Sequence, residues 1–271
     1  MPAIFGPGTP TKYQSHRTYG TRRSTHRFRR NAAAANVAIT SYTRYLEGDA
    51  LDVTQAAGNM ASWPVKVGQA SQPGAQKPSF ETSTWVPDGG PAIRFDNVGE
   101  AFIGPIGVSA GLQTAWVLRA SQSNAVATSI LFESSPNTNS NNGYYVGITA
   151  ATQQSSTAHQ VAPNSYNAKA STISDNGNFV VTLSSIDMSQ PAATETDIWV
   201  NGVRRALSTT VNDNLTTVFD AGVQSYIGSR NDGAVAPWNG LCRVLVVGSG
   251  VLTDAQKLSL STLAMYKARV Q

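Results

Sequence analysis

Seven basic side chains lie in the first thirty residues, with no acidic residue among them. Cationic groups at this density neutralise phosphates, and interleaved aromatic rings can stack on bases. Guanidinium groups also form bidentate pairs with carboxylates on partner proteins. The segment is therefore predicted to attach to nucleic acid or to acidic protein surfaces, and its residue types do not separate the two. The seven cations are Lys12, Arg17, Arg22, Arg23, Arg27, Arg29 and Arg30.

Two loops rich in Asn, Asp and Gly carry the residue types of sugar-binding sites, at 134–145 and 229–240. Such sites combine an aromatic ring for stacking with amide or carboxylate groups for hydroxyls, often with calcium. Ordinary turn chemistry is the alternative, because Asn, Asp and Gly also populate turns for backbone reasons. No cofactor is expected apart from such a calcium ion. The candidate glycan-binding residues are Asn231, Asp232, Trp238 and Asn239.

Groups that could perform catalysis are few. His16 and His26 lie in the basic segment, and His159 lies in a polar stretch predicted to be a solvated loop. Cys242 is the single cysteine, so the chain forms no internal disulfide, and its apolar surroundings predict a buried strand. The sequence therefore predicts a protein that is not an enzyme. No run of eighteen apolar residues exists, so no membrane span is expected.

The charge is divided sharply between the basic segment and the rest of the chain. The whole chain has 20 basic and 16 acidic residues; removing the seven cations leaves 13 basic and 16 acidic residues, a net charge of −3. Residues 1–36 have few large apolar groups to offset their ordering entropy. They are predicted to form an extended basic arm that orders on a partner, and residues 37–271 are predicted to form one domain.

That domain reads as all-β. Short runs of apolar and β-branched residues alternate with clusters of turn residues, which is typical of a sandwich or barrel. Asn201-Gly202 between two such runs predicts a hairpin with a type I′ turn. The predicted strands include 92–95, 114–120, 129–133, 143–148, 179–183, 197–205, 225–229 and 242–248.

One convincing helix closes the chain. Thr253 and Gln256 have the spacing of a capping box, and the apolar residues that follow predict a face that packs on the sandwich. The expected face consists of Leu258, Leu260, Leu263 and Tyr266. A second stretch, 41–52, has some helical periodicity, and strand is nearly as well favoured there.

The order of these segments resembles the concanavalin A-like or laminin-G-like jelly-roll family found in phage and bacterial surface proteins. The matching pieces are "YLEGDALDV", "GNMASWPVKVGQASQP", "KPSF" and "GGPAIRFDN" in the first half, then "TDIWVNGV" and the closing segment from "YIGSRNDG" to "AMYKA". They cover roughly residues 42–268. The resemblance implies an antiparallel jelly-roll β-sandwich with one C-terminal helix, preceded here by the extended arm.

Some members of that family are glycoside hydrolases with the pattern E-x-D-x-x-E, in which two carboxylates carry out a retaining displacement. The nearest match here is "ETDIWV", where Glu195 and Asp197 are present and Val200 replaces the last acid. Since the general acid is missing, the resemblance does not carry hydrolase activity to this chain. A polar strand entrance is the alternative interpretation of these residues.

A basic arm joined to a lectin-like sandwich resembles the plan of viral structural proteins. The leading hypothesis is a virion component of a tailed phage: a capsid decoration, vertex, fibre or tail protein, assembled as a homo-oligomer in the host cytoplasm. One alternative is a carbohydrate-binding module at a cell surface, and a second is a main capsid protein with a genome-binding arm. The expected partners are other virion proteins or nucleic acid through the arm, further copies of the chain, and a host-surface glycan.

Overall fold

The computed structural model places the sandwich and its helix, whereas the basic arm and its predicted boundary at residue 36 lie outside the described residues. The described residues are 43–49, 54–56, 59–62, 72–73, 79–81, 92–96, 102–105, 113–124, 127–134, 143–149, 153–160, 165–172, 179–212, 215, 224–230 and 235–268.

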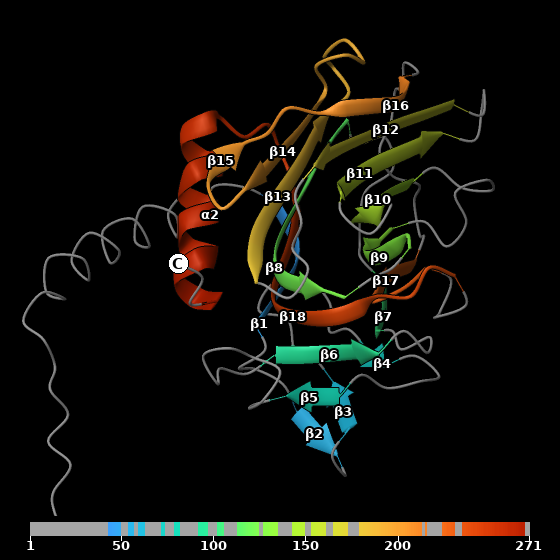
Figure 1. Ribbon diagram of the computed structural model, residues 1–271, viewed down its shortest axis with the longest axis vertical. Coiled ribbons are helices and arrows are strands. Elements are labelled where there is room, and N and C mark those ends of the chain that lie inside the picture. The colour runs from blue at the N-terminus through green and yellow to red at the C-terminus, as the bar shows by residue number, and fades with distance from the viewer. Residues whose placement is uncertain are drawn as a thin grey trace, which may run out of the picture.

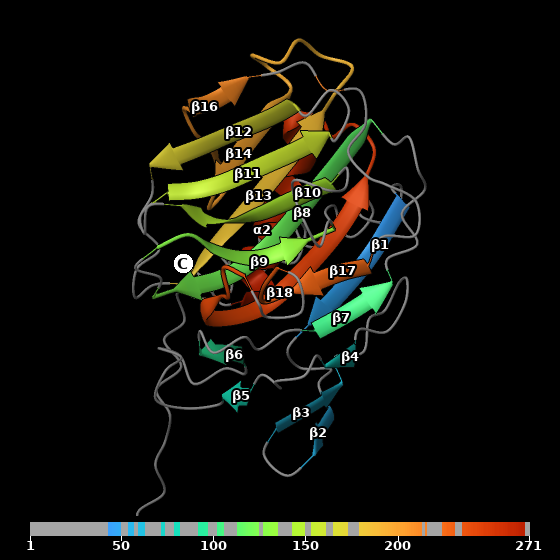
Figure 2. The same ribbon diagram turned by 90° about the vertical axis from the view of Figure 1, so that its right-hand side faces the viewer.

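Two antiparallel sheets and a helix form three layers (Figure 1). Figure 2 shows the eight-stranded sheet facing the viewer, with the ten-stranded sheet and the helix behind it. Every pairing between described strands is antiparallel, so the predicted β-sandwich with a C-terminal helix is confirmed. Because the arm is not described, its extended form stays a prediction.

The ten-stranded sheet is centred on β8 and β18, which pair over most of their length. β1 (Thr43–Asp49) and β6 each pair with a different half of β18, on the edge of β18 opposite β8. In order across the sheet the other strands are β15 (Val203–Arg204), β14 (Thr196–Val200), β13 (Val180–Asp187), β8 (Thr114–Ser123), β18 (Asn239–Ser249), β6 (Ala92–Asp96), β5 (Ser79–Glu81), β3 (Asn59–Ser62) and β2 (Thr54–Ala56).

The eight-stranded sheet includes several strands that were not predicted from the sequence. His159 lies in one of them, paired with Gly143 and Tyr166, so the predicted loop around this histidine is wrong. The helical alternative for 41–52 is also wrong, because β1 occupies its middle. In order across the sheet the strands are β16 (Ser208–Asn212), β12 (Ser165–Thr172), β11 (Gln153–Gln160), β10 (Gly143–Thr149), β9 (Ser129–Glu133), β17 (Gln224–Ile227), β7 (Phe102–Pro105) and β4 (Gln72–Pro73).

The core between the sheets is built by alternate residues of the facing strands. Val117 and Leu245 of the ten-stranded sheet share this core with Phe132 and Val146 of the eight-stranded sheet. Cys242 belongs to the same cluster and is fully buried, which confirms the prediction for it. The interior is therefore a continuous apolar layer along one part of the sandwich.

A buried arginine links the two sheets. Arg119 of β8 is 1% exposed, and its Nη2 donates to the carbonyl oxygen of Gly147 on β10 at 3.1 Å and to Gln154 Oε1 on β11. Its guanidinium carbon lies 5.0 Å from the centre of the Trp238 ring, within the range of a cation–π contact. Arg119 thus connects β8 of the ten-stranded sheet to β10 and β11 of the eight-stranded sheet.

The helix α2 (Asp254–Ala268) packs on the outer face of the ten-stranded sheet. Its predicted capping box is present: Gln256 N donates to Thr253 Oγ1 at 3.3 Å, and Thr253 N donates to Gln256 Oε1 at 2.8 Å. The predicted apolar face is only half right. Leu260 and Leu263 are buried, whereas Leu258 is 48% and Tyr266 is 49% exposed.

Position along the helix, more than hydrophobicity, decides which residues of α2 are buried. Lys257, Leu260, Ser261, Ala264 and Ala268 all lie on it, because residues three and four apart share one face. Small residues on this side let the helix approach the sheet, and Leu258 and Tyr266 lie outside the contact.

The hairpin between β14 and β15 has the predicted turn. Asn201 and Gly202 both have positive φ, 49° and 76°, as a type I′ turn requires. Asn201 also accepts a hydrogen bond through Oδ1 from the backbone N of Val181 at 2.8 Å, which ties the turn to β13.

Replacing Trp238 by Ala should destabilise the fold, because the indole is fully buried in the core between the sheets. The expected loss in free energy of unfolding is about 3–5 kcal/mol, measured by denaturant titration. Tyr266→Ala is the matched control, since this aromatic side chain is 49% exposed. Equal losses in the two variants would contradict the burial of Trp238.

Candidate functional site

A pocket of about 210 Å³ lies where the ends of β13 and β14 meet the segment between β18 and α2. This space is far larger than the roughly 10–15 Å³ that one water needs. The residues come from two stretches that are distant in sequence, 185–197 and 250–257, and most of them are polar. The polar side chains lining the pocket are Ser185, Asp187, Gln190, Thr194, Glu195, Asp197 and Lys257, and the apolar ones are Ile186, Val251 and Leu252.

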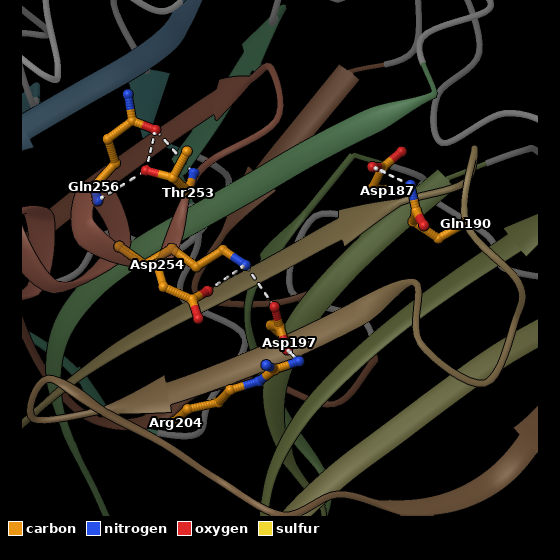
Figure 3. Close-up of polar contacts among 8 residues, drawn as sticks. Asp187, Gln190, Asp197, Arg204, Thr253, Asp254 and Gln256 are labelled. Atoms are coloured by element: carbon orange, nitrogen blue, oxygen red, sulfur yellow. Dashed lines mark hydrogen bonds and ion pairs between the residues drawn. The ribbon is translucent and has the colours of Figure 1, made fainter.

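The turn between β13 and β14 forms one wall of the pocket. Asp187 Oδ1 accepts hydrogen bonds from Ser189 N at 3.1 Å and Ser189 Oγ at 2.7 Å. Gln190 Nε2 lies 3.4 Å from Asp187 Oδ2 (Figure 3). An aspartate that accepts bonds from the backbone two residues on is a common device for fixing a turn. Asp187 is therefore held in place by its own turn.

Asp197 lies in the middle of a charge network between β14, β15 and α2. Lys257 Nζ donates to its Oδ2 at 2.5 Å, and Arg204 Nη2 lies 2.5 Å from its Oδ1. Lys257 also lies 3.9 Å from Asp254 Oδ1, on the first turn of the same helix. In Figure 3, Asp197 lies beside Arg204, with Asp254 close by. Both oxygens of Asp197 are thus occupied by cations.

Glu195 differs from its neighbours because it is buried without full compensation. The residue is 4% exposed, and its Oε1 has no hydrogen-bond partner in the described part of the chain. Burial raises the pKa of Glu195 to about 7; the positive charge of Lys169 on β12 opposes this rise and the negative charge of Asp187 adds to it. Near neutral pH this carboxyl group is therefore partly protonated.

A second polar cluster lies on the eight-stranded sheet, at the bases of the two loops proposed to bind sugar. We call Glu133, Tyr145 and Arg230 the loop-base cluster. Arg230 Nε lies 2.9 Å from each carboxylate oxygen of the fully buried Glu133, and its guanidinium carbon lies 4.7 Å from the Tyr145 ring centre. Burial raises the pKa of Glu133 to about 8, against the opposing effect of Arg230.

The loop-base cluster shows that the bases of the two predicted loops lie side by side. Tyr145, at the end of the first loop, pairs with Glu133, which in turn pairs with Tyr226 on β17, just before the second loop. A bridge between Arg230 and Val235 closes the second loop at its base. The fold therefore brings together two segments that lie almost a hundred residues apart.

The four candidate glycan-binding residues have different outcomes. Asn231 and Asp232 lie outside the described residues, so their role stays a prediction. Trp238 is fully buried beneath Arg119, and a ring without an exposed face cannot stack on a sugar, so the stacking role is not supported for this residue. Asn239 is half-buried, and its Nδ2 donates to the carbonyl oxygen of Asn124 at 3.4 Å. The seven cations of the arm also lie outside the described residues.

The sequence indicates only two of the charged residues that line the pocket. Glu195 and Asp197 were noted as a carboxylate pair two residues apart, and such residues share one face of a strand. Asp187 and Lys257 were missed, because only the fold brings them to the same place. The polar turn "SQPAATE" that follows β13 was the one local signal available.

Metal binding and membrane insertion have no positive sign in the described residues. No group of three or more His, Cys, Asp or Glu side chains there could hold a metal ion. Over the same residues, no helix is long and apolar enough to cross a membrane.

Comparison with known proteins places the fold. No protein-family model matches the chain, and no curated protein matches it. Among solved structures, domain 4 of AbnA, a GH43 extracellular arabinanase from Geobacillus stearothermophilus in complex with arabinotriose, is 16% identical. It has a TM-score of 0.52 over 81% of this chain and 98% of that domain.

The binding region of botulinum neurotoxin gives the same result. The serotype D ligand-binding domain in complex with N-acetylneuraminic acid is 10% identical, with a TM-score of 0.53 over 83% of this chain and 52% of that one. The binding domain of serotype D/C is 12% identical, also with a TM-score of 0.53. This chain therefore spans about half the length of the toxin fragments. The likeness shows the fold alone, an antiparallel β-sandwich of the kind found in these domains.

The stability of the protein should depend on pH through Glu195. Because its folded-state pKa is about 7, above the usual 4.5, the folded chain keeps a proton that the unfolded chain releases. The free energy of unfolding should therefore fall as pH rises from about 4.5 through 7, by up to about 3 kcal/mol from this group.

Glu195→Gln tests this pH dependence. The variant cannot ionise at this position, so it should lose this part of the slope and keep the part that comes from Glu133. Asp96→Asn, which removes an exposed carboxylate at the end of β6, is the control and should keep the wild-type slope. The measurement is urea unfolding at a series of pH values; a slope unchanged in Glu195→Gln would refute the assignment.

Proposed function

We propose that the sandwich is a carbohydrate-binding domain and that the pocket between β13, β14 and α2 holds the sugar. The observation that carries the proposal is the shared fold: the solved sandwiches that it resembles include one in complex with arabinotriose and one in complex with N-acetylneuraminic acid. Fold alone does not give function, so the pocket has to supply the chemistry.

The pocket supports this proposal by its size and by its polar groups. Gln190 and Thr194 are exposed at its rim, and both carry groups that donate and accept hydrogen bonds. Val251 and Leu252 add an apolar surface beside them. Sugars present hydroxyl groups around a ring with apolar faces, so a mixed lining of this kind fits them better than a purely apolar one.

Binding without cleavage is the expected outcome. A retaining glycosidase needs one free carboxylate as nucleophile and a second carboxyl group as acid. Both oxygens of Asp197 are occupied, by Lys257 and Arg204, and Val200 is buried in the sandwich where the hydrolase pattern has its last acid. Glu195 alone cannot complete the pair.

The full-length protein should bind immobilised oligosaccharides on a glycan array. The double variant Gln190→Ala/Thr194→Ala removes two exposed polar side chains of the rim and should weaken binding by about tenfold or more. Tyr266→Ala, an exposed aromatic residue of α2 that does not line the pocket, should bind as the wild type does.

Two results would contradict the proposal. Absence of binding to every glycan would remove the function. Loss of binding in Tyr145→Ala, with the rim variant unaffected, would move the site to the loop-base cluster. Mass spectrometry of the recovered glycan checks the expectation of no cleavage.

A second candidate function is the virion component, and the distribution of charge favours it. The first thirty residues carry seven cations and no acid, whereas the rest of the chain has a net charge of −3. Such segregation suits a separate attachment arm that anchors the sandwich in an assembly and leaves the sugar-binding surface outside. The two functions are compatible, since a virion protein can expose a glycan-binding domain.

Deleting residues 1–36 tests the anchoring role. The truncated chain should fail to join particles when mixed with candidate capsid shells, while its glycan binding remains, because the pocket is built wholly from residues 185–257. Sedimentation of the particles, followed by quantification of the bound chain, measures this. Undiminished incorporation would exclude the arm as an anchor.

A further inference from the structure

The lining of the pocket has more carboxylates than cations. Three carboxylates and one ammonium group line it. Lys257 and Arg204 are both paired with Asp197, so this aspartate is already compensated. Asp187 is hydrogen-bonded by Ser189 and Gln190, and the charge of Glu195 is opposed by Lys169 of β12.

Glu195 adds an unused acceptor to this charge. Its Oε1 is buried and has no partner among the described groups, and the residue lines the pocket. A buried polar atom without a hydrogen bond costs about 1–3 kcal/mol. A ligand that donates a hydrogen bond to this atom recovers the cost.

The chemistry of the missing donor follows from charge and hydrogen bonding together. A hydroxyl group donates one hydrogen bond and brings no charge, whereas an ammonium group donates three and compensates the carboxylates. A carboxylate-bearing sugar would be repelled by Asp187 and Glu195. The described residues offer no cluster with the composition of a metal site, which leaves an organic cation as the best match.

We infer that the pocket selects saccharides bearing a free primary amine, with the ammonium group donating to Glu195 and Asp187. The saccharide part rests on the proposed function, and the ammonium part rests on the pocket itself. Ser185, Gln190 and Thr194 are placed to contact the hydroxyl groups of the same ring.

The charged groups around Glu195 come from every neighbouring element. They are Lys169 of β12, Asp187 of β13, Asp197 of β14 and Lys257 of α2. A bound ammonium group that donates to Glu195 favours the ionised form of its carboxyl group. Binding of an amine that stays protonated should therefore release a proton from the protein near pH 7 and should strengthen as pH rises from about 6 to 8.

Isothermal titration of the full chain tests the inference with three probes. They are an oligomer of glucosamine, the oligomer of N-acetylglucosamine of the same length, and n-butylamine. The two oligomers have the same rings and differ at the nitrogen, which is a free amine in one and an uncharged acetylated amide in the other. The amine oligomer is expected to bind at least about tenfold more tightly than the acetylated one. Butylamine, whose pKa is close to the roughly 10.4 of lysine, stays charged throughout and reports the pH dependence of the protein alone.

Two variants and one control locate the effect. Glu195→Gln and Asp187→Asn should each abolish the preference for the amine, and Asp96→Asn should keep it. Circular dichroism and unfolding curves establish that each variant is folded. If Glu195→Gln alone does not fold, Asp187→Asn still decides the point.

Each outcome separates the two proposals. Equal binding of both oligomers overturns the amine preference and leaves the carbohydrate function standing. Binding of butylamine without either oligomer overturns the carbohydrate function and supports a cation pocket for another amine, such as a lysine side chain. Binding of none of the three probes overturns the inference, and the glycan array then decides whether the carbohydrate function survives.

Discussion

The burial of β8 and β18 on both faces is the constraint on which the rest of the structure depends. One face of this strand pair packs against the eight-stranded sheet through residues such as Val117 and Leu245, and the other carries Trp116, Leu118, Val244 and Val246. A sheet with two apolar faces needs a layer on each side. The second sheet supplies one layer and α2 the other, so the helix is a structural requirement of the sandwich.

The docking of α2 also creates the pocket. The helix begins at its capping box, directly after the β18 segment, and its first turn brings Lys257 against Asp197. Lys257 is buried, yet its ammonium charge is paired with the carboxylate of Asp197 on β14. The same packing that covers the apolar face of the sheet therefore places a polar wall beside the β13–β14 turn. Stability and the candidate site share one contact surface.

Buried charges are treated differently at three places in the sandwich. Arg119 contacts a carbonyl oxygen, an amide oxygen and an aromatic ring. Both carboxylate oxygens of Glu133 contact Nε of Arg230. Glu195 keeps its buried Oε1 without a hydrogen-bond partner within the described residues. Desolvation penalises a charge unless hydrogen bonds or opposite charges replace water. Of these three groups, Glu195 is the one that lines the pocket.

The sequence by itself determined the strands with strong periodicity, the Asn201-Gly202 turn, the capped helix and the division of charge between arm and domain. These depend on local geometry and composition, which neighbouring residues fix. Weakly apolar strands such as β11 and β12 escaped notice, because pairing with partners stabilises them more than their own residues do. Only the tertiary structure buried Trp238, exposed Leu258 and joined Asp187, Glu195, Asp197 and Lys257 into a pocket. Burial and charge pairing depend on which distant segments meet, and that is decided by packing.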